Sequence, residues 1–188
     1  MVNLPLLEKF IEQTLSQGLG LDLTDPNLAD TPQRIARMYE ELFAGVGVEF
    51  DGFTLFPNTK SYDELIISER IDFVSVCSHH LLPFHGQAYF GYIPNKYVVG
   101  LSKLARVVMH YAKRPQIQEN LTHEIMECFI EKVNPLGAML VLRAYHSCQS
   151  IRGAKQPNAI MTTSAVHGVL KTDEKARQEM LMAIQLKS

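Results

Sequence analysis

The sequence lacks several features that would place it in a specialised class of protein. Its three cysteines are too few, and odd in number, for a disulfide scaffold, so they suggest metal binding or catalysis first and packing second. No apolar run reaches the roughly 20 residues needed to span a bilayer. Residues 1–13 contain no basic leader followed by an apolar block, so no secretory signal is expected. We therefore expect a cytoplasmic protein with no membrane partner.

The chain also lacks an excess of charge of either sign. Its 188 residues carry 18 Lys and Arg against 20 Asp and Glu, a net charge of −2, which argues against a nucleic-acid partner. With 46% apolar residues, the chain is long enough to bury a sizeable core. Its length predicts one domain with an appendage, and it contains no internal repeat or low-complexity tract.

The first part of the chain, residues 1–45, is expected to be a helical extension. Apolar residues recur at three-to-four spacing over 3–18, which predicts a helix. A second helix is expected to begin after Asp30, whose side chain would cap it, with Pro32 in its first turn. This helix would end near Gly45. Its inner face would carry Ile35, Met38, Tyr39 and Leu42, and its outer face Arg34 and Arg37.

The second part, residues 46–188, is expected to be the main domain. Strand patterns at 63–77 and 87–93 are separated by a connection at 77–86. Two helices follow, over 100–113 and from Pro115 to 133, then strands at 138–148 and 158–169 and a helix at 173–184. This order predicts an α+β fold with a mostly antiparallel sheet.

Acidic residues are absent from two long segments, 73–118 and 134–172. Nine Lys and Arg, two of the three cysteines and six of the seven histidines lie in these segments. Strands and buried helices are poor in acids in any case, but that does not explain why the bases remain. A concentrated positive field suits a small polyanion such as a nucleoside triphosphate.

Two short motifs in these segments predict a metal site. Cys77 and His80 have the spacing of two ligands on a tight turn. His146 and Cys148, if they lie on one strand, project from the same face about 6–7 Å apart. Cysteine and imidazole together favour zinc, and the four candidate groups are Cys77, either His79 or His80, His146 and Cys148. A Cys-His-Cys set would leave a fourth position for water, as in catalytic zinc sites. Cys128 lies beside an apolar stripe and is expected in the core.

Several longer motifs resemble the GTP cyclohydrolase I family. They span about residues 28–185 in the family's order. They are DTPQRIARM (30–38), CSHHLLPF (77–84), YIP (92–94) with GLSKLAR (100–106), RPQIQE (114–119), and HSC (146–148) with RG (152–153). The resemblance implies the T-fold, an antiparallel sheet with a helix pair on one face. It also implies a homodecamer of two stacked pentamers, with active sites at subunit boundaries.

The resemblance implies that residues 46–188 form the catalytic domain, and it implies a reaction and its residues. The reaction is hydrolysis of GTP to formate and 7,8-dihydroneopterin triphosphate, a step toward pterin or folate. The implied zinc ligands are Cys77, His80 and Cys148. His79 and His146 are the implied proton-transfer pair, with His146 protonating N7 of guanine. The implied substrate contacts are Gln118 and Glu119 for guanine, Ser102 near the ribose, and Lys103, Arg106, Arg152, Arg34 and Arg37 for the triphosphate.

The sequence departs from the family pattern at two positions. Ser78 stands where the family usually has Glu, and Asn120 where Arg is common. Neither change removes an implied ligand or proton donor. Two other interpretations stay open: a non-catalytic T-fold protein that retained zinc, and a related enzyme with a cysteine nucleophile acting on a deazapurine. The pairing of Cys77 with Cys148 and His80 argues against the nucleophile.

Overall fold

The computed structural model describes residues 2–185, which fall into two compact units that divide after Val48. The predicted boundary, after residue 45, lies three residues earlier. The catalytic role given to the second part stays a prediction, and the last three residues of the predicted 46–188 domain lie outside the described residues.

The N-terminal unit contains two helices. Helix α1 (Leu4–Gln13) begins after Asn3, whose side-chain oxygen accepts a hydrogen bond of 3.2 Å from the Leu6 N–H. A π-helical turn, η1 (Thr14–Gly18), follows directly, so the helix predicted over 3–18 changes its hydrogen-bond pattern near its end. Helix α2 (Thr31–Leu42) is the second helix.

The start and the inner face of α2 differ from the prediction. Asp30 makes no side-chain capping bond, because its carboxylate pairs instead with the Arg34 guanidinium at 3.2 Å. The residues buried in α2 are Pro32 and Ala36, whereas Met38, predicted to face inward, is 45% exposed. The helix therefore buries a narrower apolar stripe within its unit than its sequence suggests.

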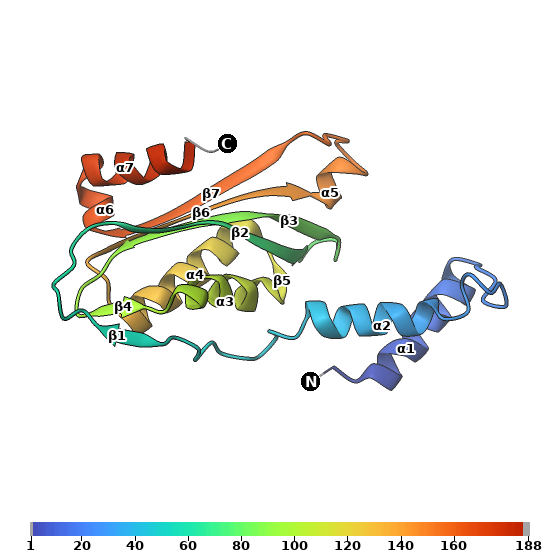
Figure 1. Ribbon diagram of the computed structural model, residues 1–188. Helices are drawn as coiled ribbons and strands as arrows, with labels where there is room; N and C mark the ends of the chain where they lie inside the picture. Colours follow the sequence, from blue (N-terminus) through green and yellow to red (C-terminus); the bar gives the residue numbers. More distant parts are fainter. Residues whose placement is uncertain (1, 186–188) are drawn as a thin grey trace. The chain divides into compact units, whose positions relative to one another are not determined.

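The second unit is built on a five-stranded sheet with the order β5-β2-β3-β6-β7 (Figure 1). Its four long strands are antiparallel: β2 (Ile66–Cys77), β3 (Pro83–Ile93), β6 (Gly137–His146) and β7 (Ile160–Gly168). The two-residue strand β5 (Pro115–Gln116) pairs parallel to the end of β2. A separate two-stranded sheet joins β1 (Leu55–Pro57) to β4 (Tyr97–Val99).

Helices cover both faces of the large sheet. Helix α3 (Leu101–Ala112) and helix α4 (Gln118–Val133) pack against one face and form most of the core with it. Helix α6 (Val169–Thr172) and helix α7 (Glu174–Gln185) pack on the other face near one end, as Figure 1 shows. The one-turn helix α5 (Ser147–Ser150) follows β6. The α+β class and the helix pair on one face of an antiparallel sheet, predicted as a T-fold, are confirmed.

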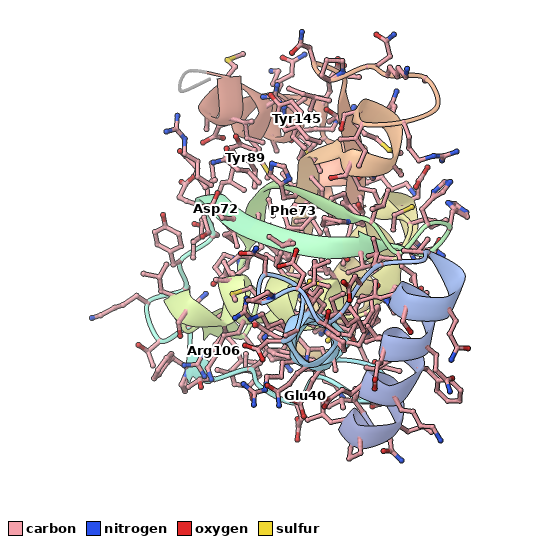
Figure 2. The ribbon with its side chains drawn as sticks, turned by 90° about the vertical axis from the view of Figure 1, so that its right-hand side faces the viewer. Glu40, Asp72, Phe73, Tyr89, Arg106 and Tyr145 are labelled. Carbon is pink, nitrogen blue, oxygen red and sulfur yellow. The ribbon has the colours of Figure 1, made fainter. Side chains whose placement is uncertain are left out.

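Side chains alternate between the two faces, as strand geometry requires. In β2, Phe73 is buried toward α3 and α4, whereas its neighbour Asp72 is exposed. Tyr89 and Tyr145 lie on the sheet face away from α3, the helix that carries Arg106 (Figure 2). The strong alternation in β2 is why this strand could be predicted from its sequence.

Two predicted boundaries are wrong in ways that affect the site. Strand β3 begins at Pro83, not at Gln87, so the connection between β2 and β3 is only residues 78–82. Pro83 has no N–H, and the first position of a strand tolerates this. Strand β6 ends at His146, so Cys148 lies on α5 and not on the strand. Helices that combine the length and apolar character needed for a membrane span are absent from residues 2–185.

Candidate metal centre and active site

Cys77 is the last residue of β2, and a tight turn folds the next residues back over it. The N–H groups of His80 and Leu81 donate to the Cys77 carbonyl, at 3.3 and 2.9 Å, and the Cys77 N–H donates to the Leu82 carbonyl at 2.8 Å. The left-handed backbone of Leu81, with φ of 51°, closes the turn. As a result the Nδ1 atoms of His79 and His80 lie 3.8 and 3.9 Å from the Cys77 sulfur.

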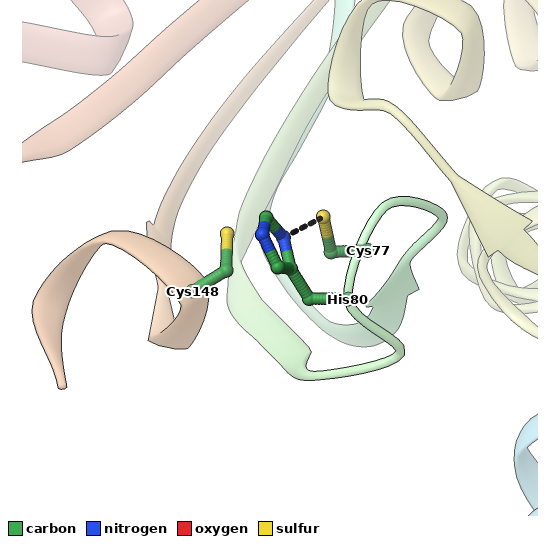
Figure 3. A group of neighbouring side chains, drawn as sticks. All are labelled: Cys77, His80 and Cys148. Carbon is green, nitrogen blue, oxygen red and sulfur yellow. Dashed lines mark hydrogen bonds between the residues drawn. The ribbon is translucent and has the colours of Figure 1, made fainter. Parts of the chain in front are cut away.

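Cys148 reaches the same place from the end of β6, which is separated from β2 by β3 in the sheet. The register of β3 and β6 pairs Phe84 with His146, so β6 ends beside the start of β3. The chain then turns into α5, which carries the Cys148 thiol toward the β2–β3 turn. The donor atoms of Cys77, His80 and Cys148 all lie within 4.8 Å of one another, with the His80 ring between the two cysteines (Figure 3).

The chemistry of these three donors fits a zinc ion. Two sulfurs bound to one zinc at about 2.3 Å in a tetrahedral arrangement lie roughly 3.8 Å apart, which is within the 4.8 Å spread of the three donor atoms. Both thiols are free. Burial raises the pKa of Cys148, and the neighbouring Cys77 raises it further because two adjacent thiolates repel each other. A divalent cation removes that repulsion, so the pair is better suited to a metal than to two bare thiolates.

A guanidinium lies at the edge of this group. The Nη1 atom of Arg152, which is exposed, lies 2.8 Å from the His80 Nε2. Arginine can only donate, so Nε2 accepts and the His80 Nδ1 faces Cys77. The positive charge of Arg152 also lowers the pKa of Cys148, against the larger effect of burial. Of the five basic residues implied for the triphosphate, Arg152 is therefore the one beside the metal group.

His146 ends β6 and is held between an aromatic ring and an amide. Its ring stacks on Phe84 with 4.5 Å between centroids and 7° between planes. Its Nε2 lies 2.8 Å from the Gln118 Oε1. Burial lowers the pKa of His146, and the Glu119 carboxylate raises it by a smaller amount. No local pattern predicted Phe84 as a neighbour of His146, because only the register of β3 and β6 places the two side by side.

The two residues predicted to bind guanine face different surroundings, although both open α4. Gln118 is 1% exposed and hydrogen-bonded within the chain, whereas Glu119 is exposed. Glu119 is close enough to His146 to raise its pKa. The structure therefore brings the Glu119 carboxylate near the proposed proton donor and leaves it open to solvent, while the Gln118 side chain is turned inward.

Three other predicted substrate contacts lie away from the metal group within one chain. Ser102, Lys103 and Arg106 are in the first half of α3, whereas the end of α3 leads to β5, which pairs with Cys77 (Figure 1). A helix rises about 1.5 Å per residue, so along its axis Ser102 lies roughly 15 Å and Arg106 roughly 9 Å from Ala112, the last residue of α3. Arg34 and Arg37 belong to the N-terminal unit. Ser78 and Asn120, where the sequence departs from the family pattern, are both exposed.

The fold and the donor set together define a class: a T-fold protein with a Cys-His-Cys group that could hold a metal ion. The comparison with known families makes this specific. The chain belongs to the GTP cyclohydrolase I family, whose profile matches residues 7–185. As a member of this family it is an enzyme.

Relatives match along the whole chain. The GTP cyclohydrolase 1 of Thermoanaerobacter pseudethanolicus is 43% identical over 188 residues, covering 100% of both chains. That of Desulforamulus reducens is 42% identical over 185 residues, covering 98% of each, and that of Mycolicibacterium gilvum is 46% identical over 166 residues, covering 87% of this chain and 82% of the relative. A solved structure, the apo form of the archaeosine synthase QueF-Like, is 20% identical with a TM-score of 0.45, covering 56% of this chain and 94% of that one.

Proposed function

We propose that this protein is a zinc-dependent enzyme that converts GTP and one water to formate and 7,8-dihydroneopterin triphosphate. The observation that carries the proposal is the Cys77, His80 and Cys148 group, which stands beside a half-buried histidine in a chain of the GTP cyclohydrolase I family. The near-complete coverage of relatives named GTP cyclohydrolase 1 supports GTP as the substrate. The product would supply pterin or folate synthesis in the cytoplasm.

Cys77, His80 and Cys148 would hold the zinc ion, whose chemistry when bound is to lower the pKa of water so that hydroxide is available near neutral pH. The group contributes three protein donors. This donor count matches catalytic zinc sites, in which three protein ligands leave one position for a solvent or substrate atom.

His146 and His79 would move the protons. C8 of guanine is a poor electrophile, and protonation of N7 by the His146 imidazolium makes C8 easier for water to attack. His79 is exposed beside Cys77, with its Nδ1 3.8 Å from the sulfur, and is placed to exchange a second proton as the imidazole ring opens. C8 is then released as formate, and the ribose rearranges so that its carbons complete the new dihydropterin ring.

Glu119 would recognise the guanine base. Its carboxylate accepts two N–H groups from the pyrimidine edge of guanine, a charge-assisted pairing that adenine cannot reproduce. The exposed position of Glu119 at the start of α4, close enough to His146 to affect its pKa, supports this role. The base would then lie with its N7 toward His146.

The triphosphate would be held by Arg152 of one chain together with residues of a second copy. Lys103 and Arg106, with Ser102 near the ribose, lie on the half of α3 away from β5 and Cys77, so a neighbouring chain would supply them to the site. Arg34 and Arg37 are the remaining contacts proposed for the phosphates. The family resemblance is the reason for proposing a homodecamer of two stacked pentamers, and this arrangement supports active sites at subunit boundaries. Light scattering should give about ten times the 21.2 kDa chain mass, and a monomer would contradict the shared site.

The experiment that tests the function is incubation of the purified protein with GTP, with and without a chelator. Pteridine fluorescence and formate should appear together, and both should be lost in the chelated protein and in His146→Ala. Zinc content, measured by mass analysis, should be one ion per chain. Stoichiometric zinc and GTP binding without either product would instead indicate a binding protein, and turnover without zinc would indicate a cysteine nucleophile.

A further inference from the structure

The Gln118 side-chain amide is saturated by hydrogen bonds inside the chain. Its Nε2 lies 3.1 Å from each of three acceptors, the carbonyls of Leu142 and Met161 and the hydroxyl of Thr163. An amide nitrogen has two hydrogens, so these three acceptors use its full donor capacity. With only 1% of the residue exposed, this amide nitrogen is not available to a substrate.

The surroundings also determine which terminal atom of the Gln118 side chain is the oxygen and which is the nitrogen. The carbonyls of Leu142 and Met161 only accept hydrogen bonds, so the atom that faces them must be the nitrogen. The hydroxyl groups are consistent with this orientation. The Thr122 hydroxyl donates to the main-chain carbonyl of Gln118 at 2.7 Å. The Thr163 hydroxyl can then donate to Thr122 at 2.7 Å while it accepts from the Gln118 side-chain nitrogen. A flipped amide would place its oxygen against two carbonyl oxygens, and buried like dipoles of this kind are costly.

The direction of the Gln118 amide sets the direction of its contact with His146. Its oxygen faces the His146 Nε2 at 2.8 Å, and an amide oxygen only accepts, so Nε2 must carry a hydrogen. The parallel Phe84 ring, 4.5 Å away, opposes tilting of the imidazole out of this contact. The His146 ring is therefore held in one plane and one orientation.

We propose that Gln118 is a positioning residue for His146, and that its side chain does not contact guanine. By accepting the Nε2 hydrogen, Gln118 commits the other ring nitrogen, Nδ1, to proton exchange with the substrate. The inference deepens the proposed function, because it rests on His146 as the proton donor to N7. Recognition of the base then falls to Glu119 on the adjacent position of α4. The arrangement follows the general rule that the hydrogen bond at one imidazole nitrogen determines the role of the other.

The first test reads the ring itself. Zinc-loaded protein labelled with ¹⁵N-histidine is studied by long-range ¹H–¹⁵N correlation at a pH where His146 is neutral, with His146→Gln used to assign its signals. We expect the Nε2–H tautomer in the wild-type protein and a mixture of tautomers in Gln118→Met. The Nδ1–H tautomer in the wild type, or an unchanged spectrum in Gln118→Met, would overturn the proposal.

The second test separates positioning from substrate contact. With GTP, Gln118→Met should lower kcat by about 10- to 100-fold, within the range of general acid–base contributions, and change KM less than about twofold. A raised KM with kcat intact would identify a guanine contact and contradict the proposal. Thr163→Val is the matched control, because it removes one acceptor of the same buried network but keeps the Gln118 oxygen, and it should stay within about threefold of wild type.

The two tests also separate this inference from the proposed function. A wild-type protein that fails to act on GTP would contradict the function, while the tautomer of His146 would still report on Gln118. Should Gln118→Met fail to fold, the wild-type tautomer alone decides. An active enzyme with the Nδ1–H tautomer would overturn the role of Gln118 and leave the function standing.

Discussion

The two ends of the large sheet are formed by the same strands, but one end carries reactive polar side chains and the other a covered apolar cluster. At one end, β2 and β6 finish at Cys77 and His146, and the turn and helix beyond them leave the Cys148 thiol and the imidazoles at least partly open to solvent. At the other end, α6 and α7 cover the sheet with a small apolar cluster of Tyr89, Met139, Val141, Leu170, Met180 and Ile184. We therefore expect substitutions at the first end to change zinc content and activity, and substitutions at the second end to change the free energy of unfolding.

The largest expected effect is at the metal end. Cys77→Ser should remove the zinc ion and lower activity on GTP by about a thousandfold or more, because losing a ligand costs more than the roughly 10- to 100-fold typical of an outer-shell partner. Metal analysis and product fluorescence measure the two effects. The matched control is Cys128→Ala, since Cys128 is buried beside Tyr111 and outside the donor group. Full zinc content in Cys77→Ser would contradict the site.

A smaller effect is expected at the start of α4. Glu119→Gln should lower kcat/KM for GTP by about 10- to 100-fold, the equivalent of one hydrogen bond to a charged group. Zinc content should not change. Glu127→Gln provides the control, because Glu127 is an exposed glutamate of the same helix that pairs with His123 at 3.2 Å. If both variants have the same kcat/KM for GTP, Glu119 does not recognise the guanine base.

At the covered end the effect should be on stability alone. Leu170→Ala removes a fully buried side chain and should lower the free energy of unfolding by about 2–4 kcal/mol, while zinc content stays at the wild-type level. Urea unfolding measures the loss. Leu181→Ala on α7, where the side chain is 36% exposed, should cost less than about 1 kcal/mol. A loss of zinc in Leu170→Ala would show that the two ends are coupled.

The smallest expected effect is a loss of stability at alkaline pH, caused by Tyr111 on α3 and Cys128 on α4. Burial raises the pKa of Tyr111 well above its ordinary value of 10.0, and burial also raises the pKa of its neighbour Cys128 above 9.0. Both groups keep their protons to higher pH in the folded protein than in the unfolded chain. Their contribution to stability is complete below about pH 9 and is lost as the pH rises further. Urea unfolding at about pH 8 and pH 10.5 measures this slope, which should be shallower in Tyr111→Phe; an identical slope would contradict it.

Much of the site could be predicted because its residues sit in compact motifs. Cys77 and His80 belong to a single turn, and the structure places Cys148 with its sulfur within 4.8 Å of their donor atoms, while the role of the three as ligands stays a prediction. The reason given for Cys148 was wrong, however. The pattern suggested a strand that presents His146 and Cys148 on one face, whereas the chain leaves the sheet after His146 and turns into α5.

The role of Gln118 could not be predicted from the sequence. Its hydrogen-bond partners lie 24 to 45 positions further along the chain, on β6 and β7, and only the antiparallel register brings them together. The same holds for Phe84, which reaches His146 through the pairing of β3 with β6. Local patterns predict elements and short-range ligands, but contacts between distant strands depend on register, which a single sequence does not specify.

The two-residue strand β5 has a consequence for how this site can vary. Pro115 and Gln116 are paired with Val76 and Cys77, and the Gln116 carbonyl also accepts the Ser78 N–H at 3.0 Å. Glu119 follows only three residues later. The distance from the sulfur of Cys77 to the carboxylate of Glu119 therefore depends on a very short segment of backbone that is hydrogen-bonded to the end of β2. One residue inserted between Gln116 and Glu119 would displace the carboxylate by several ångströms and favour a base of different size.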